Sequence, residues 1–219
     1  MSLILNLETS SKNCSVSLSS KGKLIDLIES EDENYRHSEL LTTSIQDILS
    51  KNNLNVKSLD AISVGIGPGS FTGLRIGLSV SKGLCYPHNI NLIGISTLKI
   101  LANSVKPVTD NIVCLINDKG NYFYMSKYNS DLEELIPPKI QLIDKEFIDK
   151  TINDSTSIIV NTDNAYSHVS EILDKDLKLD KHVISSSNMI ELSQKAFDKK
   201  IFEDIAYVEP MYIKKPYVN

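Results

Sequence analysis

The residues best suited to chemistry lie between positions 65 and 84, which hold six of the nine glycines. A glycine-rich loop that leads into a helix can bind phosphate, because glycine admits close backbone approach and amides at a helix start attract anions. Residues 67–73 read Gly-Pro-Gly-Ser-Phe-Thr-Gly. They lack the Gly-Lys-Ser/Thr ending of a P-loop, and Pro68 removes an amide from the dinucleotide fingerprint. Taken alone, the loop gives weak support for phosphate binding.

Other reactive side chains form no catalytic or metal-binding pattern. Ser70 lies among the glycines, but no histidine stands at a predictable distance to act as its base. We predict instead that Ser70 caps the following helix by accepting a hydrogen bond from an amide near Gly73. The four histidines have no ligand spacing with one another or with cysteine, so no metal site is indicated. Each of the three cysteines lies in an apolar run, which predicts buried, reduced thiols at Cys14, Cys85 and Cys114.

The helix expected from about Ser70 to Cys85 carries a stripe of small residues at a spacing of four, Gly73, Gly77 and Ser81. A glycine inside a helix lowers the stability of the helix by about 1 kcal/mol relative to alanine. A stripe with two internal glycines therefore indicates that a close contact requires them. Small side chains let another backbone come close. Either the helix at 38–51 of the same chain covers the stripe, or both helices form a protein–protein interface, which we favour. The predicted interface comprises Leu41, Ile45, Gly69, Phe71, Thr72, Gly73, Leu74, Arg75, Gly77, Leu78 and Ser81.

The first half of the chain reads as three strands followed by alternating helices and strands. Residues 13–19 alternate, with an apolar face and a face of three serines, which predicts a strand with one dry face. Residues 29–34 are polar and read as a loop. The other expected strands are 4–7, 24–28, 59–66 and 91–95, and the expected helices are 38–51, 70–85 and 97–105.

The second half repeats this order more weakly, which predicts an α/β protein of two lobes, residues 1–105 and 106–219, joined only by residues 106–111. A helix at 188–199 should have Met189, Leu192 and Phe197 on its dry side. The expected strands are 112–116, 122–128, 158–160 and 183–185, with another between 132 and 143 that Pro137 and Pro138 would break. The expected turn is 117–121, and the remaining helices are 144–151 and one around 169–173.

Composition limits the function classes. The chain is 41% hydrophobic and 23% charged, which suits a packed core. Its formal net charge is -5, which argues against binding nucleic acid alone through a broad basic surface. No apolar run reaches the length of a membrane span, and the first residues lack a basic segment. These features predict a soluble, cytoplasmic protein with no membrane partner.

Four segments carry a family resemblance. Residues 67–77, Gly-Pro-Gly-Ser-Phe-Thr-Gly-Leu-Arg-Ile-Gly, closely resemble the signature of the TsaB (YeaZ) family, a bacterial subunit of the machinery that makes threonylcarbamoyladenosine in tRNA. Residues 4–10 look like the family's opening strand, and His37-Ser38 precedes a helix as in the family. Pro210-x-Tyr212-Ile213-Lys214 resembles its Pro-x-Tyr-Leu-Arg ending. The resemblance covers the first hundred residues well and the rest sparsely.

The resemblance implies the actin/Hsp70/sugar-kinase (ribonuclease H-like) fold, with a mixed central sheet flanked by helices in each lobe. It implies a non-catalytic scaffold or activator subunit that forms a heterodimer with the TsaD catalytic subunit, which modifies adenosine 37. The helices of the first lobe would form the interface. A TsaE ATPase would join the complex, tRNA would bind only through it, and a homodimer is possible when the chain is alone. No cofactor is expected for the chain itself, with ATP only at the assembled complex.

ATP-using proteins of that fold carry Asp-x-Gly in the first hairpin, where this chain has Glu8-Thr9-Ser10 as a degenerate phosphate-site candidate. The family's Asp-Ala-Arg segment becomes Asn117-Asp118-Lys119, and the His-x-x-x-His metal pair of TsaD-type catalysts is missing. For Glu8 and Asp118 the alternatives are solvated turn residues or residual metal ligands, and we favour solvated turn residues. We expect Lys214 and Lys215 to face solvent. The alternative function is an ATP-dependent enzyme or a metallopeptidase of the same fold.

Overall fold

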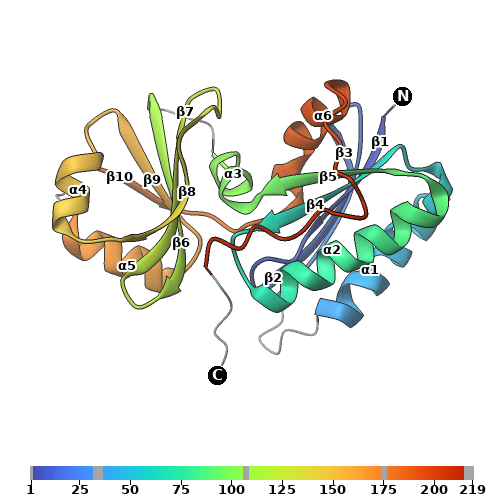
Figure 1. Ribbon diagram of the computed structural model, residues 1–219, viewed down its shortest axis with the longest axis horizontal. Helices are drawn as coiled ribbons and strands as arrows, with labels where there is room; N and C mark the ends of the chain where they lie inside the picture. Colours follow the sequence, from blue (N-terminus) through green and yellow to red (C-terminus); the bar gives the residue numbers. More distant parts are fainter. Residues whose placement is uncertain (1, 32–36, 106–108, 174–176, 215–219) are drawn as a thin grey trace. The chain divides into compact units, whose positions relative to one another are not determined.

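The chain forms two compact units in the computed structural model, which describes residues 2–31, 37–105, 109–173 and 177–214 (Figure 1). The first unit contains residues 1–100 and 184–211, and the second contains the remainder. The predicted boundary between residues 105 and 106 therefore misses a segment, because residues 184–211 return to the first unit. Parts of two predicted connections, 32–34 and 106–108, and the tail residue Lys215 lie outside the described residues.

The first unit is built on a five-stranded sheet in the order β3-β2-β1-β4-β5. The first three strands pair antiparallel, and β1, β4 and β5 run parallel, which confirms the predicted meander and the two strands that follow. Residues 29–31 belong to β3 and not to a loop, because they pair with residues 13–15 of β2. The strands are β1 (Leu3–Glu8), β2 (Asn13–Ser20), β3 (Lys23–Glu31), β4 (Ala61–Gly67) and β5 (Asn91–Ser96).

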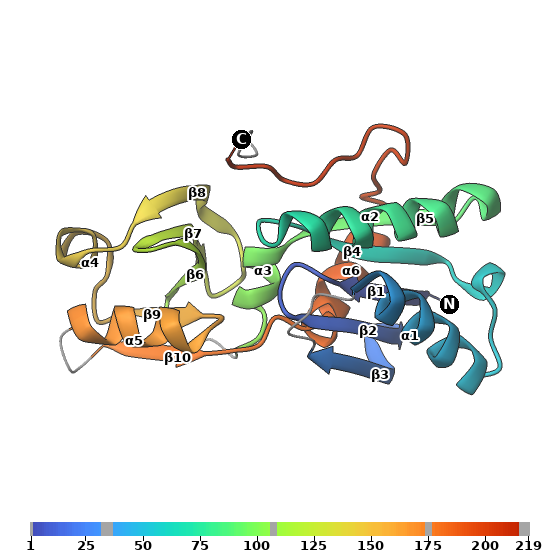
Figure 2. The ribbon, with the colours of Figure 1, turned by 90° about the horizontal axis from the view of Figure 1, so that it is seen from below.

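Two helices, α1 (His37–Lys51) and α2 (Phe71–Cys85), cover one face of this sheet (Figure 2). Their apolar stripes meet the alternate strand residues, so that Leu7, Val16, Leu41 and Leu78 share one core. Burial of these side chains provides the main stabilisation of the unit. The shorter elements that complete this part of the chain are η1 (Val56–Ser58), η2 (Tyr86–His88) and α3 (Thr97–Ala102).

The opposite face of the sheet is polar yet buried. Ser15, Ser17 and Ser19, which alternate with the apolar residues of β2, are at most 1% exposed. The returning segment covers them with η3 (Ser186–Met189) and α6 (Ile190–Asp198). The backbone N–H of Ser186 donates to the Ser15 hydroxyl at 3.0 Å, and the Ser17 hydroxyl donates to the Ser186 carbonyl at 3.0 Å. The prediction of a single dry face on β2 is therefore wrong, because partner groups from residue 186 replace water.

The start of the returning segment also differs from its predicted form. Residues 183–185 form no strand, and the Ser185 hydroxyl instead accepts from the Ser187 N–H to open η3. The expected dry side of the helix is confirmed for Met189 and Leu192, which are buried. The half-buried Phe197 packs its ring edge-on against Phe202.

The second unit has a second five-stranded sheet, in the order β10-β9-β6-β7-β8. Helices α4 and α5 pack with the sheet around Val113, Phe123 and Ile158. Pro137 and Pro138 do not break β8, because β8 is an edge strand and the two prolines lie at an irregularity in its pairing with β7, between Lys139 and Ile136. Strand β10 was not predicted. The elements are β6 (Asn111–Lys119), β7 (Tyr122–Asn129), β8 (Glu134–Leu142), α4 (Lys145–Thr151), β9 (Thr156–Val160), α5 (Asp163–Ile172) and β10 (Lys178–Lys181).

Replacing Ser15 tests the polar contact between β2 and the segment 184–211, which packs on the first unit. In Ser15→Ala the buried N–H of Ser186 loses its acceptor, so the free energy of unfolding should fall by about 1–3 kcal/mol. Ser50→Ala, at an exposed position of α1, should change it by less than about 0.5 kcal/mol. Urea unfolding of both variants measures the difference, and equal midpoints would contradict this account of the fold.

Candidate functional site

The turn after β1 and the start of α2 form one hydrogen-bonded unit. The Ser70 hydroxyl accepts from the Gly73 N–H at 3.2 Å, which confirms the predicted helix cap. The Ser70 N–H donates to the Ser10 carbonyl at 2.7 Å, and the Thr9 hydroxyl donates to the Gly73 carbonyl at 2.8 Å. The region predicted as a degenerate phosphate loop is thus occupied by the chain's own helix start.

The glycines of the loop and helix are required by this close approach. A Cβ added at Gly69 would lie 2.6 Å from the Ser10 carbonyl oxygen, and one at Gly73 would overlap the Thr9 carbonyl oxygen. A Cβ at Gly77 would overlap the Thr9 hydroxyl. The small residues therefore do allow another backbone to come close. That backbone is the Thr9–Ser10 turn that follows β1 in the same chain.

This arrangement contradicts the predicted outward orientation of the stripe. Ser81 is fully buried, and its hydroxyl donates to the Gly77 carbonyl at 2.8 Å. The stripe meets Thr9 and not helix α1, so it cannot be the surface that a partner contacts, whereas an interface formed by other residues of the two helices stays a prediction. Seven of the eleven predicted interface residues are buried inside the first unit: Leu41, Ile45, Gly73, Leu74, Gly77, Leu78 and Ser81.

The other four predicted residues reach the surface. Thr72 and Arg75 are exposed, and Gly69 and Phe71 are half-buried. The Arg75 guanidinium lies 3.9 Å from the centre of the Phe71 ring, a cation–π contact between side chains one helical turn apart. The surface of α2 therefore begins with an ordered aromatic and cationic pair.

Glu8 is buried, not solvated as predicted. Its Oε1 accepts from the Ser10 N–H at 2.6 Å, and its Oε2 lies so close to Gly65 of β4 that a Cβ there would overlap it. Burial raises the pKa of the Glu8 carboxyl, and the hydrogen bonds from Ser10 and Thr9 only partly oppose this. The carboxyl predicted at the degenerate phosphate site is therefore enclosed by the sheet of its own unit.

The second turn is also occupied by the chain. Asp118 accepts from the Lys214 ammonium at 2.9 Å and from the Tyr124 hydroxyl at 3.2 Å, and its side chain is 14% exposed. The expectations that Asp118 is a solvated turn residue and that Lys214 faces solvent are therefore wrong. Strand β6 continues to Lys119, which leaves only Gly120 and Asn121 between the strands.

The remaining chemistry is limited. The three cysteines are free and buried, as predicted, and burial raises the thiol pKa of Cys14 to about 11 and of Cys85 to about 12. Within residues 2–31, 37–105, 109–173 and 177–214, no group of three or more His, Cys, Asp or Glu residues could hold a metal ion. In the same ranges no helix is both long and apolar enough to cross a membrane.

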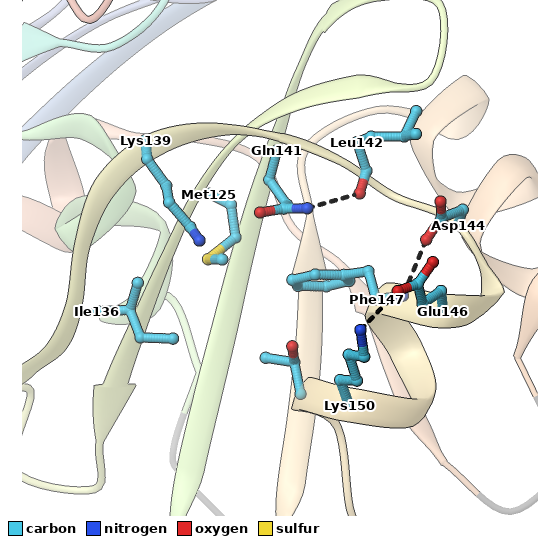
Figure 3. A pocket seen from close by; sticks show the side chains of 10 residues that line it. Met125, Ile136, Lys139, Gln141, Leu142, Asp144, Glu146, Phe147 and Lys150 are labelled. Carbon is cyan, nitrogen blue, oxygen red and sulfur yellow. Dashed lines mark hydrogen bonds and ion pairs between the residues drawn. The ribbon is translucent and has the colours of Figure 1, made fainter.

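A separate hollow of about 340 Å³ lies in the second unit (Figure 3). Met125 and Phe147 form its apolar side, and Lys139, Gln141 and Lys150 reach it from β8 and α4. Lys150 pairs with Glu146 at 2.5 Å, and the Gln141 amide donates to the neighbouring Leu142 carbonyl at 3.0 Å. None of the predicted site residues lines this hollow.

Sequence reasoning missed the two contacts that define these turns, Thr9 with Gly73 and Asp118 with Lys214. The first had a signal, because glycines at positions 69 and 73 require a neighbouring backbone and the first hairpin supplies the nearest one. The second had only the matching charges, 96 residues apart in sequence. Without the fold, those two charges could not be paired.

Two glycines of α2 should respond in opposite directions to alanine. No heavy atom lies within 4 Å of a Cβ added at Gly83, so Gly83→Ala should raise the free energy of unfolding by about 0.5–1 kcal/mol through helix propensity. Gly73→Ala should lower it by about 1–3 kcal/mol, because the methyl group overlaps the Thr9 carbonyl. Chemical unfolding of the two variants measures both effects, and a gain for both would show that the first turn does not constrain α2.

Glu8 should make stability depend on pH. An unfolded glutamate loses its proton near pH 4.3, whereas folded Glu8 keeps it to a higher pH, so the folded state binds more protons over that interval. This contribution is fully present below the unfolded pKa and is lost as pH rises through the folded pKa. Glu8→Gln cannot titrate, so the wild type should lose thermal stability relative to it as the pH rises above the unfolded pKa and through the raised folded pKa. Parallel melting profiles of the two proteins would show that Glu8 has an ordinary pKa.

Comparisons with known proteins lead to proteins that make threonylcarbamoyladenosine in tRNA. A family model described as TsaD, tRNA N6-adenosine threonylcarbamoyltransferase, matches residues 31–218. The tRNA threonylcarbamoyladenosine biosynthesis protein TsaB of Haemophilus influenzae is 27% identical over 226 residues, which cover 96% of this chain and 93% of that protein. TsaB of Escherichia coli is 30% identical over 133 residues, or 58% of this chain and 55% of that protein.

A solved structure of YeaZ from Pseudomonas aeruginosa superposes with a TM-score of 0.82. It is 21% identical and covers 97% of this chain and all of that chain, a likeness that establishes the fold. The predicted fold class, two lobes with mixed central sheets of the actin/Hsp70/sugar-kinase type, is confirmed. The loop signature, the two sheets and the matches over nearly the whole chain lead to one assignment: the chain belongs to the TsaB (YeaZ) family.

Proposed function

We propose that this chain is a non-catalytic partner subunit that supports threonylcarbamoyladenosine formation at position 37 of tRNA by docking on a TsaD-type transferase. The observation that carries the proposal is the occupied first turn, in which the Ser70 N–H donates to the Ser10 carbonyl at 2.7 Å. An amide at a helix start is the group that would otherwise bind phosphate. A member of this fold that uses that amide internally is better suited to a scaffold than to phosphoryl chemistry.

The carboxylates of the two turns support the same proposal. A carboxylate that acts on a bound metal must be ionised and accessible. Glu8 is enclosed and its pKa is raised, and Asp118 is neutralised by Lys214. Each side chain therefore serves the fold of its own unit.

The docking face we propose is the outer face of α2 together with the exposed side of α1. Thr72, Ser79 and Gly83 are small, exposed residues on this outer face, and the half-buried Ile76 and Val80 flank them. Gly83 has no neighbour within 4 Å that demands a glycine, although glycine weakens the helix by about 1 kcal/mol. A partner helix that packs closely here would explain why position 83 has no side chain.

In the complete assembly, a TsaE-type ATPase would join the pair, and tRNA would reach this chain only through the complex. In the absence of the transferase, the same outer face would pair two copies of this chain. The proposed setting is the cytoplasm, where tRNA is modified.

Reconstitution tests the proposed function directly. The reaction contains tRNA, threonine, bicarbonate, ATP and the other subunits, and is run with and without this chain. We expect the rate at which modified adenosine forms to be much higher with the chain than without it, and equal rates would contradict the proposal. Calorimetry of the isolated chain with ATP and magnesium separates the enzyme alternative, since micromolar binding would favour an ATP-dependent enzyme.

A bulky side chain on the proposed docking face should block the partner without unfolding the chain. In Ser79→Tyr the ring would stand between the helices, so affinity for the TsaD-type subunit should fall at least about tenfold, or about 1.4 kcal/mol. Ser170→Tyr, exposed on α5 of the second unit, is the matched control and should bind normally. Sedimentation of the mixtures and melting of each variant measure the effect, and equal affinity of the two variants would exclude this face.

A further inference from the structure

We propose that Glu8 is the positioning residue of the docking helix: its side chain sets the Thr9–Ser10 turn, and that turn holds the first turn of α2 in the orientation that a partner meets. The inference rests on the proposed function for its consequence in binding. It also has a direct consequence in the free protein, which can be measured without any partner.

The contacts form an unbroken series from Glu8 to α2. Glu8 Oε1 accepts from the Ser10 N–H at 2.6 Å, across only two residues, which closes the turn at the end of β1. The Ser10 carbonyl then accepts from the Ser70 N–H at 2.7 Å, the residue that caps α2. The Thr9 hydroxyl donates to the Gly73 carbonyl at 2.8 Å, one turn into the helix. Loss of the first bond releases the turn that makes the other two.

The surroundings of Glu8 fix its side chain in one place. Residues Glu8, Thr9 and Ser10 are at most 4% exposed, so the carboxyl cannot exchange its bond with Ser10 for one with bulk water. On its other side, Oε2 rests against Gly65 of the adjacent parallel strand, where a Cβ would overlap it. Glu8 therefore acts as a fixed hydrogen-bond acceptor, and Gly65 provides the space that this role needs.

The consequence lies on the surface of α2. Thr72 belongs to the first turn that the Ser70 and Gly73 contacts hold, and Arg75 follows directly after it. A helix whose first turn frays presents these residues in many orientations, and a partner must then pay the ordering cost on binding. Glu8 touches no partner in this scheme and acts through Thr9 and Ser10 alone.

Two independent substitutions test the role of Glu8. Glu8→Ala removes the acceptor, and Gly65→Ala displaces the carboxyl from the opposite side. Both should raise amide hydrogen exchange at Ser70, Gly73 and Leu74, whose N–H groups are hydrogen-bonded in this region, by at least about tenfold, with exchange in α5 of the second unit unchanged. Both should weaken binding of the TsaD-type subunit by about tenfold. Glu8→Gln keeps an acceptor oxygen and should restore both measurements to within about twofold of the wild type.

Leu18→Ala is the control for a general loss of stability, because Leu18 is fully buried in β2, where it pairs with Leu5 and not with Glu8. It should leave exchange at Ser70, Gly73 and Leu74 and partner affinity near the wild-type values. Wild-type exchange in Glu8→Ala, or an equal effect of Leu18→Ala on α2, would overturn the inference. If the wild type itself fails to bind the TsaD-type subunit, the proposed function fails, and the exchange data alone decide the role of Glu8.

Discussion

The close approach of the Thr9–Ser10 backbone to the first turn of α2 is the constraint on which the first unit depends. It requires glycine at positions 69, 73 and 77, because each added Cβ would meet an atom of that turn. This close approach also engages the Ser70 amide and the Gly73 carbonyl at the helix start in hydrogen bonds within the chain, so that these groups do not face a ligand. It also fixes which side of α2 is buried, and so leaves Thr72 and Ser79 on the outside. One contact thus accounts for these three glycines of the signature and for the side of α2 that is exposed.

The order of the elements could be predicted from local patterns, because each depends on neighbouring residues. The alternation of Cys14, Val16 and Leu18, the stripe of α1 and the cap at Ser70 all read correctly. The small-residue stripe correctly predicts a close neighbour, but the predicted neighbour is a helix, whereas the structure has Thr9 there. A stripe of glycines indicates that a backbone comes close and does not indicate which backbone it is, so the predicted interface includes residues that are buried inside the first unit.

Long-range polar contacts were beyond the reach of local patterns. Serines that alternate along a strand look like a solvated face, and only the return of residues 184–198 shows that they are satisfied inside the protein. The same holds for Asp118 and Lys214, whose opposite charges pair across 96 residues. A buried glutamate is rare enough that solvation was the natural expectation for Glu8, and its enclosure by Gly65 becomes visible only with the strands in register.

The return of residues 184–211 also sets the order of events during synthesis. Ser15 and Ser186 are 171 residues apart, so the polar face of the first sheet stays uncovered until nearly the whole chain has been made. At about 5–20 residues per second, the interval lasts roughly 10–30 s. The second unit is continuous from residue 101 to residue 183 apart from its last residues, so it has most of its strands available before the first unit can close. All five strands of the N-terminal sheet are thus translated by residue 96, but its polar face is exposed to water until residues 184–198 cover it, so this unit reaches its final stability only near the end of synthesis.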